Sequence, residues 1–240
     1  MKVYALSNVG KVRPLNEDSF YAPAPEERFC CVADGMGGHN AGEVASAMAV
    51  ETFSAQMLNQ RLLPHERLRR AVSEANYAIY ERGRENSSMR GMGTTITALL
   101  IENGEAHIAH VGDSRCYLLR SRSLMQLTTD HTLVEELIAK GAITPREAAN
   151  HPQRNVITRA LGAEGEVEAD LLRVRLLPGD QFLLCSDGLY NCVNEHELAE
   201  ILNSRMRREN KVAALIERAL DAGAPDNVTA MIVDAEEDVR

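Results

Sequence analysis

The chain has 240 residues and a formal net charge of −9, with 45% hydrophobic and 25% charged residues. This balance is typical of a soluble globular protein, and no apolar run approaches the ~20 residues of a membrane-spanning helix. The acidic charge argues against nucleic acid as a partner. The densest basic group, Arg67, Arg69 and Arg70, lies at helical spacing near Glu66 and Glu74. We expect it to be a solvent-exposed helix face, and we expect neither nucleic acid nor membrane as a partner.

The N-terminal segment 1–14 has neither the apolar core of a signal peptide nor a lipidation motif. The chain has five cysteines, an odd number, and several lie in apolar runs. Neighbouring Cys30 and Cys31 should point to opposite faces of one strand. We expect buried, reduced thiols and a cytoplasmic protein.

In the first part of the chain, short apolar runs give way to two helical patterns. Pro64 is a typical first residue of a helix, and Asp-Gly closes the second apolar run. The expected elements are a strand at 2–7, a polar turn at 16–18, a strand at 29–33, helices at 43–58 and 64–85, and a loop at 84–93.

The remainder is richer in strands, and Asn103-Gly104 marks a hairpin turn. Segment 141–160 has little periodicity, which is frequent in functional flaps. The expected elements are strands at 94–101, 106–111 and 116–120, a helix at 132–140, strands at 171–176 and 181–185, helices at 195–202 and 211–221, and a strand at 228–233. This order predicts an α+β fold with mostly antiparallel sheet, in one domain spanning 1–240.

Aspartates at the ends of apolar strands are the most informative feature of the sequence. The pattern is an apolar strand followed by aspartate and a small residue, and it occurs at Asp34-Gly35, Asp113-Ser114 and Asp187-Gly188. A fourth pair, Asp226-Asn227, precedes its strand instead. A single such aspartate could be a turn residue, but four with the same placement predict a shared site.

Carboxylates that converge at buried strand ends repel one another and are costly to ionise without a cation. Few lysines or arginines flank these positions. Divalent cations with a preference for oxygen ligands, Mg²⁺ or Mn²⁺, would resolve the repulsion. Gly35, which lacks a Cβ, would let its own carbonyl approach such an ion. The loop containing Arg13, Glu17 and Asp18 adds two carboxylates and a group that can bind phosphate.

Other phosphate chemistries fit the sequence poorly. The loop after Asp34 lacks the third glycine of a dinucleotide-binding motif, because position 40 is Asn40. Cys116 and Arg122 have the spacing of thiolate phosphatases, but the residues between them include no glycine for a phosphate cradle. His107 and His110 lie three apart on a strand and should face opposite sides.

Taken together, the motifs resemble the metal-dependent protein phosphatase family, also called protein phosphatase 2C, and in particular its short bacterial branch. They occur in the family's order from Arg13 to Asn227 and are specific as a set. The segments concerned are Arg13 with Asn16-Glu17-Asp18, Asp34 to Gly38, Gly91 to Thr95, Gly112 to Arg115, Leu127 to His131, Ser186-Asp187-Gly188 and Asp226-Asn227.

The resemblance implies a β-sandwich of two antiparallel sheets flanked by helix pairs, with a flap at 131–160. It implies two core ions, Mn²⁺ or Mg²⁺, and a weaker third ion. Asp34 would bridge the two core ions, the Gly35 carbonyl would bind the second, and Asp187 and Asp226 would hold the first. Glu17 and Asp18 would act through water, Asp113 with Asp187 would match the third site, and Arg13 would hold the substrate phosphate.

The implied activity is hydrolysis of phosphoserine and phosphothreonine in proteins, by direct attack of a metal-bridging water or hydroxide on phosphorus. The implied enzyme is a monomer that acts on the substrates of serine/threonine kinases. Many family members have a histidine after the Asp-Gly pair, where this chain has Met36. His39 is therefore the candidate general acid.

Two alternatives remain open at this point. The chain could hydrolyse small phosphoesters, because a fold alone does not choose among substrates. It could also be a catalytically weak regulatory module that binds phosphoproteins, although the retained Asp34, Asp187 and Asp226 argue against that.

Overall fold

The computed structural model describes residues 1–37, 41–59 and 61–235. The strands are β1 (Lys2–Asn8), β2 (Asp18–Tyr21), β3 (Phe29–Met36), β4 (Gly93–Thr94), β5 (Ile96–Glu102), β6 (Glu105–Val111), β7 (Arg115–Arg120), β8 (Ser123–Gln126), β9 (Asp170–Arg175), β10 (Gln181–Cys185) and β11 (Val228–Asp234). The helices are α1 (Ala41–Met57), α2 (Pro64–Glu85), the 3₁₀ turn η1 (Ser87–Met89), α3 (Leu133–Ala139), α4 (Pro145–Ala148), α5 (Asp187–Tyr190), α6 (Glu195–Asn203) and α7 (Arg208–Asp221).

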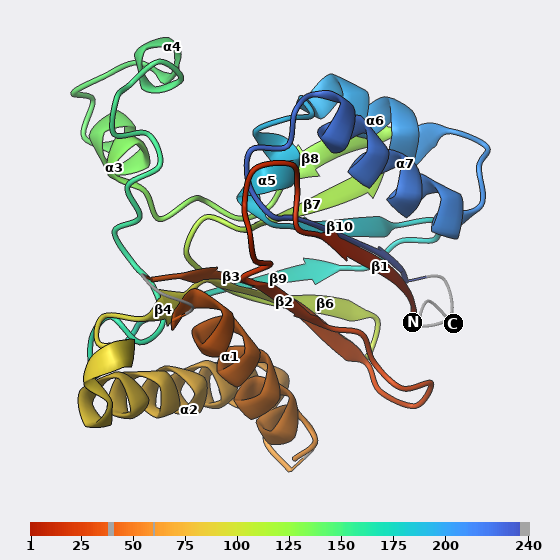
Figure 1. Ribbon diagram of the computed structural model, residues 1–240. Coiled ribbons are helices and arrows are strands. Elements are labelled where there is room, and N and C mark those ends of the chain that lie inside the picture. The colour runs from red at the N-terminus through yellow and green to blue at the C-terminus, as the bar shows by residue number, and fades with distance from the viewer. Residues whose placement is uncertain (38–40, 60, 236–240) are drawn as a thin grey trace.

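The strands form two antiparallel sheets that face each other. One sheet has the order β1-β11-β10-β7-β8, and the other has the order β2-β3-β5-β6-β9, with β4 paired to β3. The pair α1 and α2 covers the outer face of the second sheet, whereas α5, α6 and α7 cover the first (Figure 1). The predicted sandwich of two sheets between helix layers is therefore confirmed.

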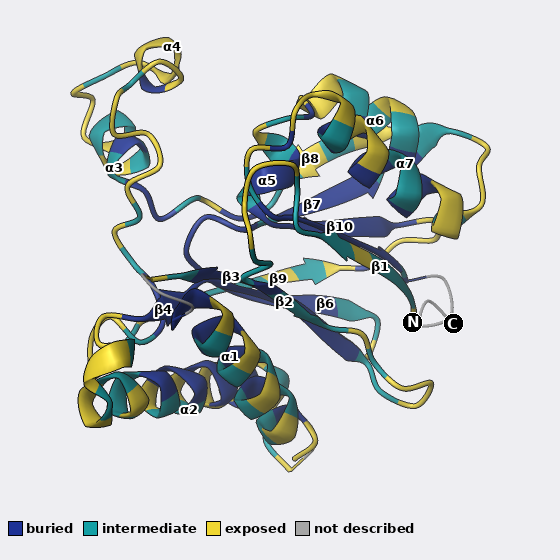
Figure 2. Ribbon diagram, viewed as in Figure 1, coloured by how far each residue is buried: buried dark blue, intermediate teal, exposed yellow. Residues whose placement is uncertain are grey.

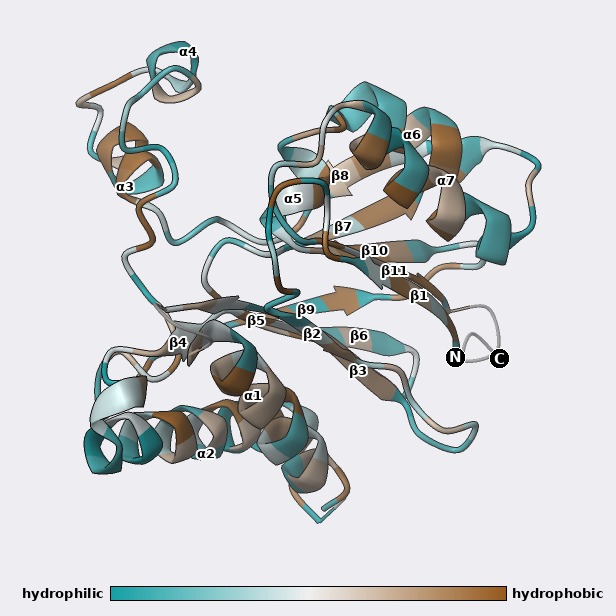
Figure 3. Ribbon diagram, in the orientation of Figure 1, coloured by the Kyte–Doolittle hydropathy of each residue, from teal (hydrophilic) through white to brown (hydrophobic). Residues whose placement is uncertain are grey.

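Three apolar clusters fill the three interfaces between these layers. The cluster between the sheets contains Cys30, Phe182 and Met231. A second cluster lies between α1, α2 and their sheet, and a third lies under α6 and α7. Figure 2 shows the buried residues on the sheets and on the inward faces of the helices, and Figure 3 shows the hydrophobic residues on the same faces. Each layer is thus packed against its neighbour, and the cluster between the sheets favours a fixed distance between them.

Alternation along β3 explains why this strand can serve two cores at once. Cys30 lies in the cluster between the sheets, whereas Cys31 packs against the α1 and α2 layer. The prediction that the two thiols face opposite sides is confirmed. All five cysteines are free, and four are buried.

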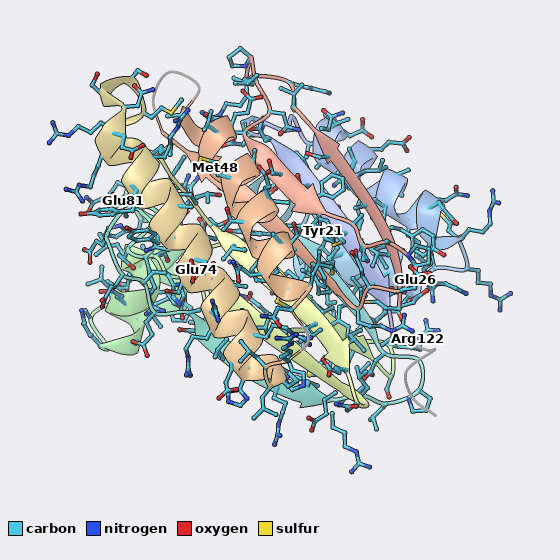
Figure 4. All side chains as sticks on the ribbon, turned by 90° about the horizontal axis from the view of Figure 1, so that it is seen from below. Tyr21, Glu26, Met48, Glu74, Glu81 and Arg122 are labelled. Carbon is cyan, nitrogen blue, oxygen red and sulfur yellow. The ribbon has the colours of Figure 1, made fainter. Side chains whose placement is uncertain are left out.

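Helices α1 and α2 run side by side over the second sheet, as Figure 4 shows from below, where Met48 marks α1 and Glu74 marks α2. Pro64 is at the start of α2, as expected. The prediction for Arg67 was wrong, because only 4% of its side chain is exposed and its guanidinium pairs with Glu102 at the end of β5. Helical periodicity does not reveal a partner from another element, and this pair is a contact between α2 and the sheet.

The expected strand at 94–101 is divided into β4 and β5, and two strands at sheet edges, β2 and β8, were not predicted from the sequence. The expected turn at 16–18 is followed at once by β2, and β8 follows β7 through a tight turn. Both are four residues long and partly polar, so their sequences lack a clear apolar alternation.

The flap carries α3 and α4 away from the body of the sandwich, at the end where β4 and α5 also lie (Figure 1). Its two ends are joined by backbone hydrogen bonds, from Leu133 N to Val156 O at 2.9 Å and from Thr158 N to His131 O at 2.8 Å. The flap is thus a closed excursion with a fixed base. Among the described residues, no helix has the length and apolar character needed to cross a membrane.

Candidate metal centre

Five aspartates from both sheets meet at the flap end of the sandwich. Asp34 belongs to β3, Asp18 begins β2, and Asp113 follows β6; Asp187 begins α5 directly after β10, and Asp226 precedes β11. Asp18 is paired with Asp34 across the two strands. One expectation is corrected, because Asp34 lies inside β3 and not at its end: Gly35 and Met36 continue the strand and pair with β4.

The pKa values of these carboxyl groups show how strongly their charges act on one another. The pKa of Asp187 is raised to about 8, first by burial and then by the charges of Asp113 and Asp226. Burial raises the pKa of Asp113 to about 6, with Asp130 adding to the effect. The pKa of Asp34 is raised well above its usual range by burial and by the neighbouring aspartates. The centre therefore has excess negative charge that a cation would neutralise.

Arg13 is the cation that the structure brings to this centre from the N-terminal loop. Its Nη2 donates to Asp226 Oδ2 at 2.8 Å, and about half of the arginine side chain is exposed. The hydrogen bond from Arg13 to Asp226 raises the pKa of the guanidinium. Arg13 thus lies at the edge of the acidic cluster, where it could contact a ligand anion.

Asn227 fixes the same loop to β11. Its side-chain amide donates to Val9 O and Leu15 O, both at 2.9 Å, and its Oδ1 accepts from Glu17 N at 2.8 Å. Glu17 is partly buried, and burial raises its pKa. Asn227 therefore positions Glu17 beside Asp226, which immediately precedes it in the chain.

Two glycines allow the aspartate segments to pack against backbone. A Cβ on Gly35 would lie 2.1 Å from Gly42 O and 2.6 Å from Glu17 O. A Cβ on Gly188 would lie 2.0 Å from Asn227 O. Atoms this close cannot coexist, so each glycine permits a contact that any other residue would prevent. Gly188 in particular places Asp187 and Asp226 on segments in direct contact.

Asp18 provides the clearest test of whether a cation fits here. Its Oδ2 accepts hydrogen bonds from Ser186 Oγ at 2.7 Å and Thr229 Oγ1 at 2.6 Å. Its Oδ1 is buried and has no hydrogen-bond partner in the described part of the chain. A buried carboxylate oxygen without a donor calls for a cation or for water bound to one. Carboxylate oxygens are also the ligands that Mg²⁺ and Mn²⁺ prefer, so the residues fit such ions.

The aspartates are spread around the centre in this conformation. Across residues 1–37, 41–59 and 61–235, no three acidic, histidine or cysteine side chains are close enough to hold one ion by themselves. Asp226 is turned to Arg13. Binding of an ion would therefore use backbone carbonyl or water ligands as well, which is usual for Mg²⁺.

A cluster that the sequence analysis did not find supports Asp113 from the flap side. The Arg115 guanidinium forms a forked ion pair with Asp130 and lies 3.7 Å from the ring centre of Tyr190. The Tyr190 hydroxyl donates to Asp113 O at 3.0 Å. A cavity of about 680 Å³ lies between this cluster and the flap, and Arg154 of the flap also lines it. In the sequence, the Asp113-Ser114-Arg115 motif was the signal that could have predicted a role for Arg115 near Asp113.

The base of the flap is anchored by a second polar cluster. Arg159 Nη1 donates to Asp170 Oδ1 at 2.7 Å, and His131 Nε2 lies 3.2 Å from Asp170 Oδ2. His131 Nδ1 in turn accepts from Gly112 N at 3.0 Å, next to Asp113. The flap base is thereby tied to the segment after β6 that carries one of the expected ligands, Asp113.

The candidate general acid His39 lies outside the described residues. Met36, which occupies the position where the resemblance led us to expect histidine, is the last residue of β3 and pairs with Gly93. The thioether of Met36 cannot donate a proton.

Comparison with known proteins gives consistent matches over most of the chain. The family model described as Protein phosphatase 2C matches residues 12–222. A serine/threonine phosphatase stp from Listeria monocytogenes is 42% identical over 232 residues, which cover 94% of this chain and 92% of that protein.

Solved structures agree in fold. The crystal structure of the Mycobacterium tuberculosis serine/threonine phosphatase PstP/Ppp superposes with a TM-score of 0.91 and 42% identity, covering 98% of each chain. The catalytic domain of PstP in complex with two manganese ions superposes with a TM-score of 0.87 and 40% identity, covering 96% of each chain.

Proposed function

The chain belongs to the protein phosphatase 2C family, and we propose that it hydrolyses phosphoserine and phosphothreonine in proteins with the aid of bound divalent cations. The observation that carries this conclusion is the convergence of five aspartates on one end of the sandwich, with a buried Asp18 oxygen that has no donor among the described residues. Such a centre suits cations and, through them, a phosphate group.

The proposed ligands follow from the matched motifs. Asp34, Asp187 and Asp226 would hold two core ions together with the Gly35 carbonyl, and Asp113 would contribute to a weaker third. Asp18 and Glu17 would accept hydrogen bonds from water in the site. When bound, divalent cations lower the pKa of water and neutralise charge on phosphoryl oxygens.

The chain's own residues then bind and orient the substrate. Arg13 reaches the rim of the centre and can donate two parallel hydrogen bonds to a phosphate. To bind a phosphate in this way, the guanidinium of Arg13 would either give up its hydrogen bond to Asp226 or keep it while also contacting the phosphate. Asn227 holds the loop that carries Glu17, and this restricts the positions that Glu17 can take in the site. His39 is proposed to protonate the leaving oxygen.

We propose one catalytic domain spanning 1–240, with the flap at 131–160, that acts as a monomer in the cytoplasm on phosphorylated proteins. The physiological ions would be Mn²⁺ or Mg²⁺. Five free cysteines support a reducing compartment.

The decisive experiment measures release of phosphate from a phosphothreonine peptide with Mn²⁺, with a chelator, and in the variants Asp34→Ala and Asp226→Ala. We expect chelation or either substitution to reduce kcat/KM by at least ~10²-fold. Asp221→Ala, which removes an exposed aspartate at the end of α7, is the matched control and should stay near wild type. Full activity with chelator would contradict the metal-dependent mechanism.

The same assay separates the alternative functions. Faster turnover of nucleotides or small phosphoesters than of phosphopeptides would favour a small-molecule phosphatase. Tight phosphopeptide binding without turnover would favour a regulatory module. The His39→Ala variant tests the general acid: a proton donor predicts loss on the phosphothreonine peptide and little loss on p-nitrophenyl phosphate, whose leaving group needs no proton.

A further inference from the structure

A line of hydrogen bonds runs from the edge strand β1 to the buried carboxylate of Asp18. Asn16 Nδ2 lies 2.8 Å from Ser7 Oγ, and Ser7 Oγ lies 2.8 Å from Thr229 Oγ1. Thr229 Oγ1 lies 2.6 Å from Asp18 Oδ2, which Ser186 Oγ also contacts at 2.7 Å. The line begins beside a surface cavity of about 550 Å³ that Ser7 and Asn16 line, and it ends at the metal centre.

The supply of protons fixes the direction of every bond in this line. An ionised Asp18 carboxylate only accepts, so the single hydroxyl protons of Thr229 and Ser186 point to it. Thr229 Oγ1 has then no proton left for Ser7, and Ser7 must donate to Thr229. Ser7 Oγ in turn accepts from the Asn16 amide. Each donor thus strengthens the next, and all of them point to one oxygen of Asp18.

The line also joins the two sheets that carry the proposed ligands. Asp18 lies on β2 and pairs with Asp34 in one sheet, whereas Thr229 lies on β11 of the other sheet, three residues after Asp226. Ser186 immediately precedes Asp187, and Thr229 N donates to Ser186 Oγ at 3.0 Å. Asp18 is therefore where the strands of Asp34, Asp187 and Asp226 are held together by side-chain hydrogen bonds.

We propose that Thr229, with Ser7 behind it, is a positioning residue for the metal centre: the hydroxyl line holds Asp18 so that its free oxygen faces the bound cations, and it sets the spacing between the two sheets of ligands. The inference rests on the proposed function. Thr229 and Ser186 are almost completely buried, and Asp18 Oδ1 is buried without a partner among the described residues. The two oxygens of Asp18 thus have different tasks, one anchored by hydroxyls and one left for the site.

A purely structural role makes a different prediction. Loss of a buried hydroxyl would then lower the stability of the fold but leave the affinity for metal unchanged. A positioning role predicts weaker metal binding, because residues behind metal ligands typically change affinity by about 10- to 100-fold. The measurement must therefore compare metal binding with folding in the same variants.

The experiment uses the full chain and Mn²⁺ as the probe. Thr229→Val keeps the shape and removes the hydroxyl, Thr229→Ser restores it, and Ser7→Ala interrupts the line one step earlier. Ser204→Ala, at the end of α6, removes a hydroxyl that bonds only a neighbouring backbone carbonyl and is the control. The Mn²⁺ dissociation constant is measured by electron paramagnetic resonance of free Mn²⁺, and folding by urea denaturation with chelator present.

We expect Thr229→Val to raise the Mn²⁺ dissociation constant about 10- to 100-fold. Ser7→Ala, one step further from Asp18, should raise it by a smaller factor that still exceeds the change in Ser204→Ala. Thr229→Ser and Ser204→Ala should remain within about 3-fold of wild type. The double variant Thr229→Val/Ser7→Ala should bind Mn²⁺ like Thr229→Val alone, because the line is already broken.

Two outcomes would overturn the inference. The first is a folded Thr229→Val variant that binds Mn²⁺ with wild-type affinity. The second is a Ser7→Ala substitution that changes Mn²⁺ affinity by the same factor in the wild type and in Thr229→Val. If Thr229→Val does not fold, Ser7→Ala with unchanged Mn²⁺ affinity decides against it. A wild-type protein that binds no Mn²⁺ and hydrolyses no phosphopeptide would instead contradict the proposed function itself.

Discussion

Substituting Gly188 by alanine should separate two of the proposed metal ligands without removing either carboxylate. The added Cβ would lie 2.0 Å from the backbone oxygen of Asn227, and such contacts are essentially never shorter than 3.0 Å. The segment that carries Asp187 and the one that carries Asp226 must therefore move apart by about 1 Å. Backbone oxygen cannot rotate away as a flexible side chain can.

The size of the effect follows from this displacement. Forcing an extra methyl into a well-packed region costs about 1–3 kcal/mol of folding free energy. A misplacement of about 1 Å in a catalytic arrangement can reduce the rate ~10²-fold. We therefore expect Gly188→Ala to remain folded, to bind Mn²⁺ at least ~10-fold more weakly, and to lose most of its kcat/KM.

The assay combines urea denaturation, Mn²⁺ binding and hydrolysis of a phosphothreonine peptide. Gly165→Ala is the matched control, because its Cβ would lie 3.5 Å from the Tyr80 ring, an ordinary contact, at the same change in chemistry. Wild-type Mn²⁺ affinity and activity in Gly188→Ala would refute the reasoning. So would an equal loss in Gly165→Ala.

Three further predictions concern charge. Burial and His131 lower the pKa of His110 from 6.5 to about 3, so the unfolded chain binds this proton at a higher pH than the folded protein. The free energy of unfolding of the wild type should therefore fall relative to that of His110→Gln by about 1.4 kcal/mol per pH unit from about pH 6 to pH 4, and an equal pH dependence of the two proteins in urea denaturation would contradict this. Asp187→Asn should raise the melting temperature of chelator-treated protein at pH 8.5, because the pKa of Asp187 is raised to about 8 in the fold and its charge destabilises the folded state above the unfolded pKa of 3.8. The same variant should show a smaller rise in melting temperature when Mn²⁺ is added. Arg115→Lys should destabilise the protein by about 1–3 kcal/mol, because lysine cannot reproduce the fork to Asp130 or the stacking on Tyr190; thermal unfolding against an exposed Arg205→Lys control checks it.

Local pattern was sufficient for the elements whose residues interact with near neighbours in the sequence. The period of two in β3 predicted that Cys30 and Cys31 face different layers, and both clusters confirm it. Pro64 marked the start of α2. The motifs shared with the protein phosphatase 2C family occur in the family's order along the chain, and this resemblance predicted the sandwich.

Predictions from local pattern were wrong where a residue or strand has its partner far away in the chain. Arg67 had the spacing of an exposed helix face, but in the fold its guanidinium donates a hydrogen bond to Glu102, 35 residues later. Strands β2 and β8 are short and lie at sheet edges. They are strands because they pair with β3 and β7, and their own sequences show no clear alternation. The strand β3 likewise extends beyond Asp34 because β4 pairs with its last residues.

The sequence by itself determined which groups are available to the site: aspartates followed by small residues, a nearby arginine, and no other phosphate chemistry that fits. Only the tertiary structure decided how they meet. Asp18 was predicted as a carboxylate that acts through water, but its anchors Ser186 and Thr229 lie 168 and 211 residues away in the chain. Hydrogen bonds and like-charge contacts of this kind depend on the packing of two sheets, and no local pattern of residues encodes that distance.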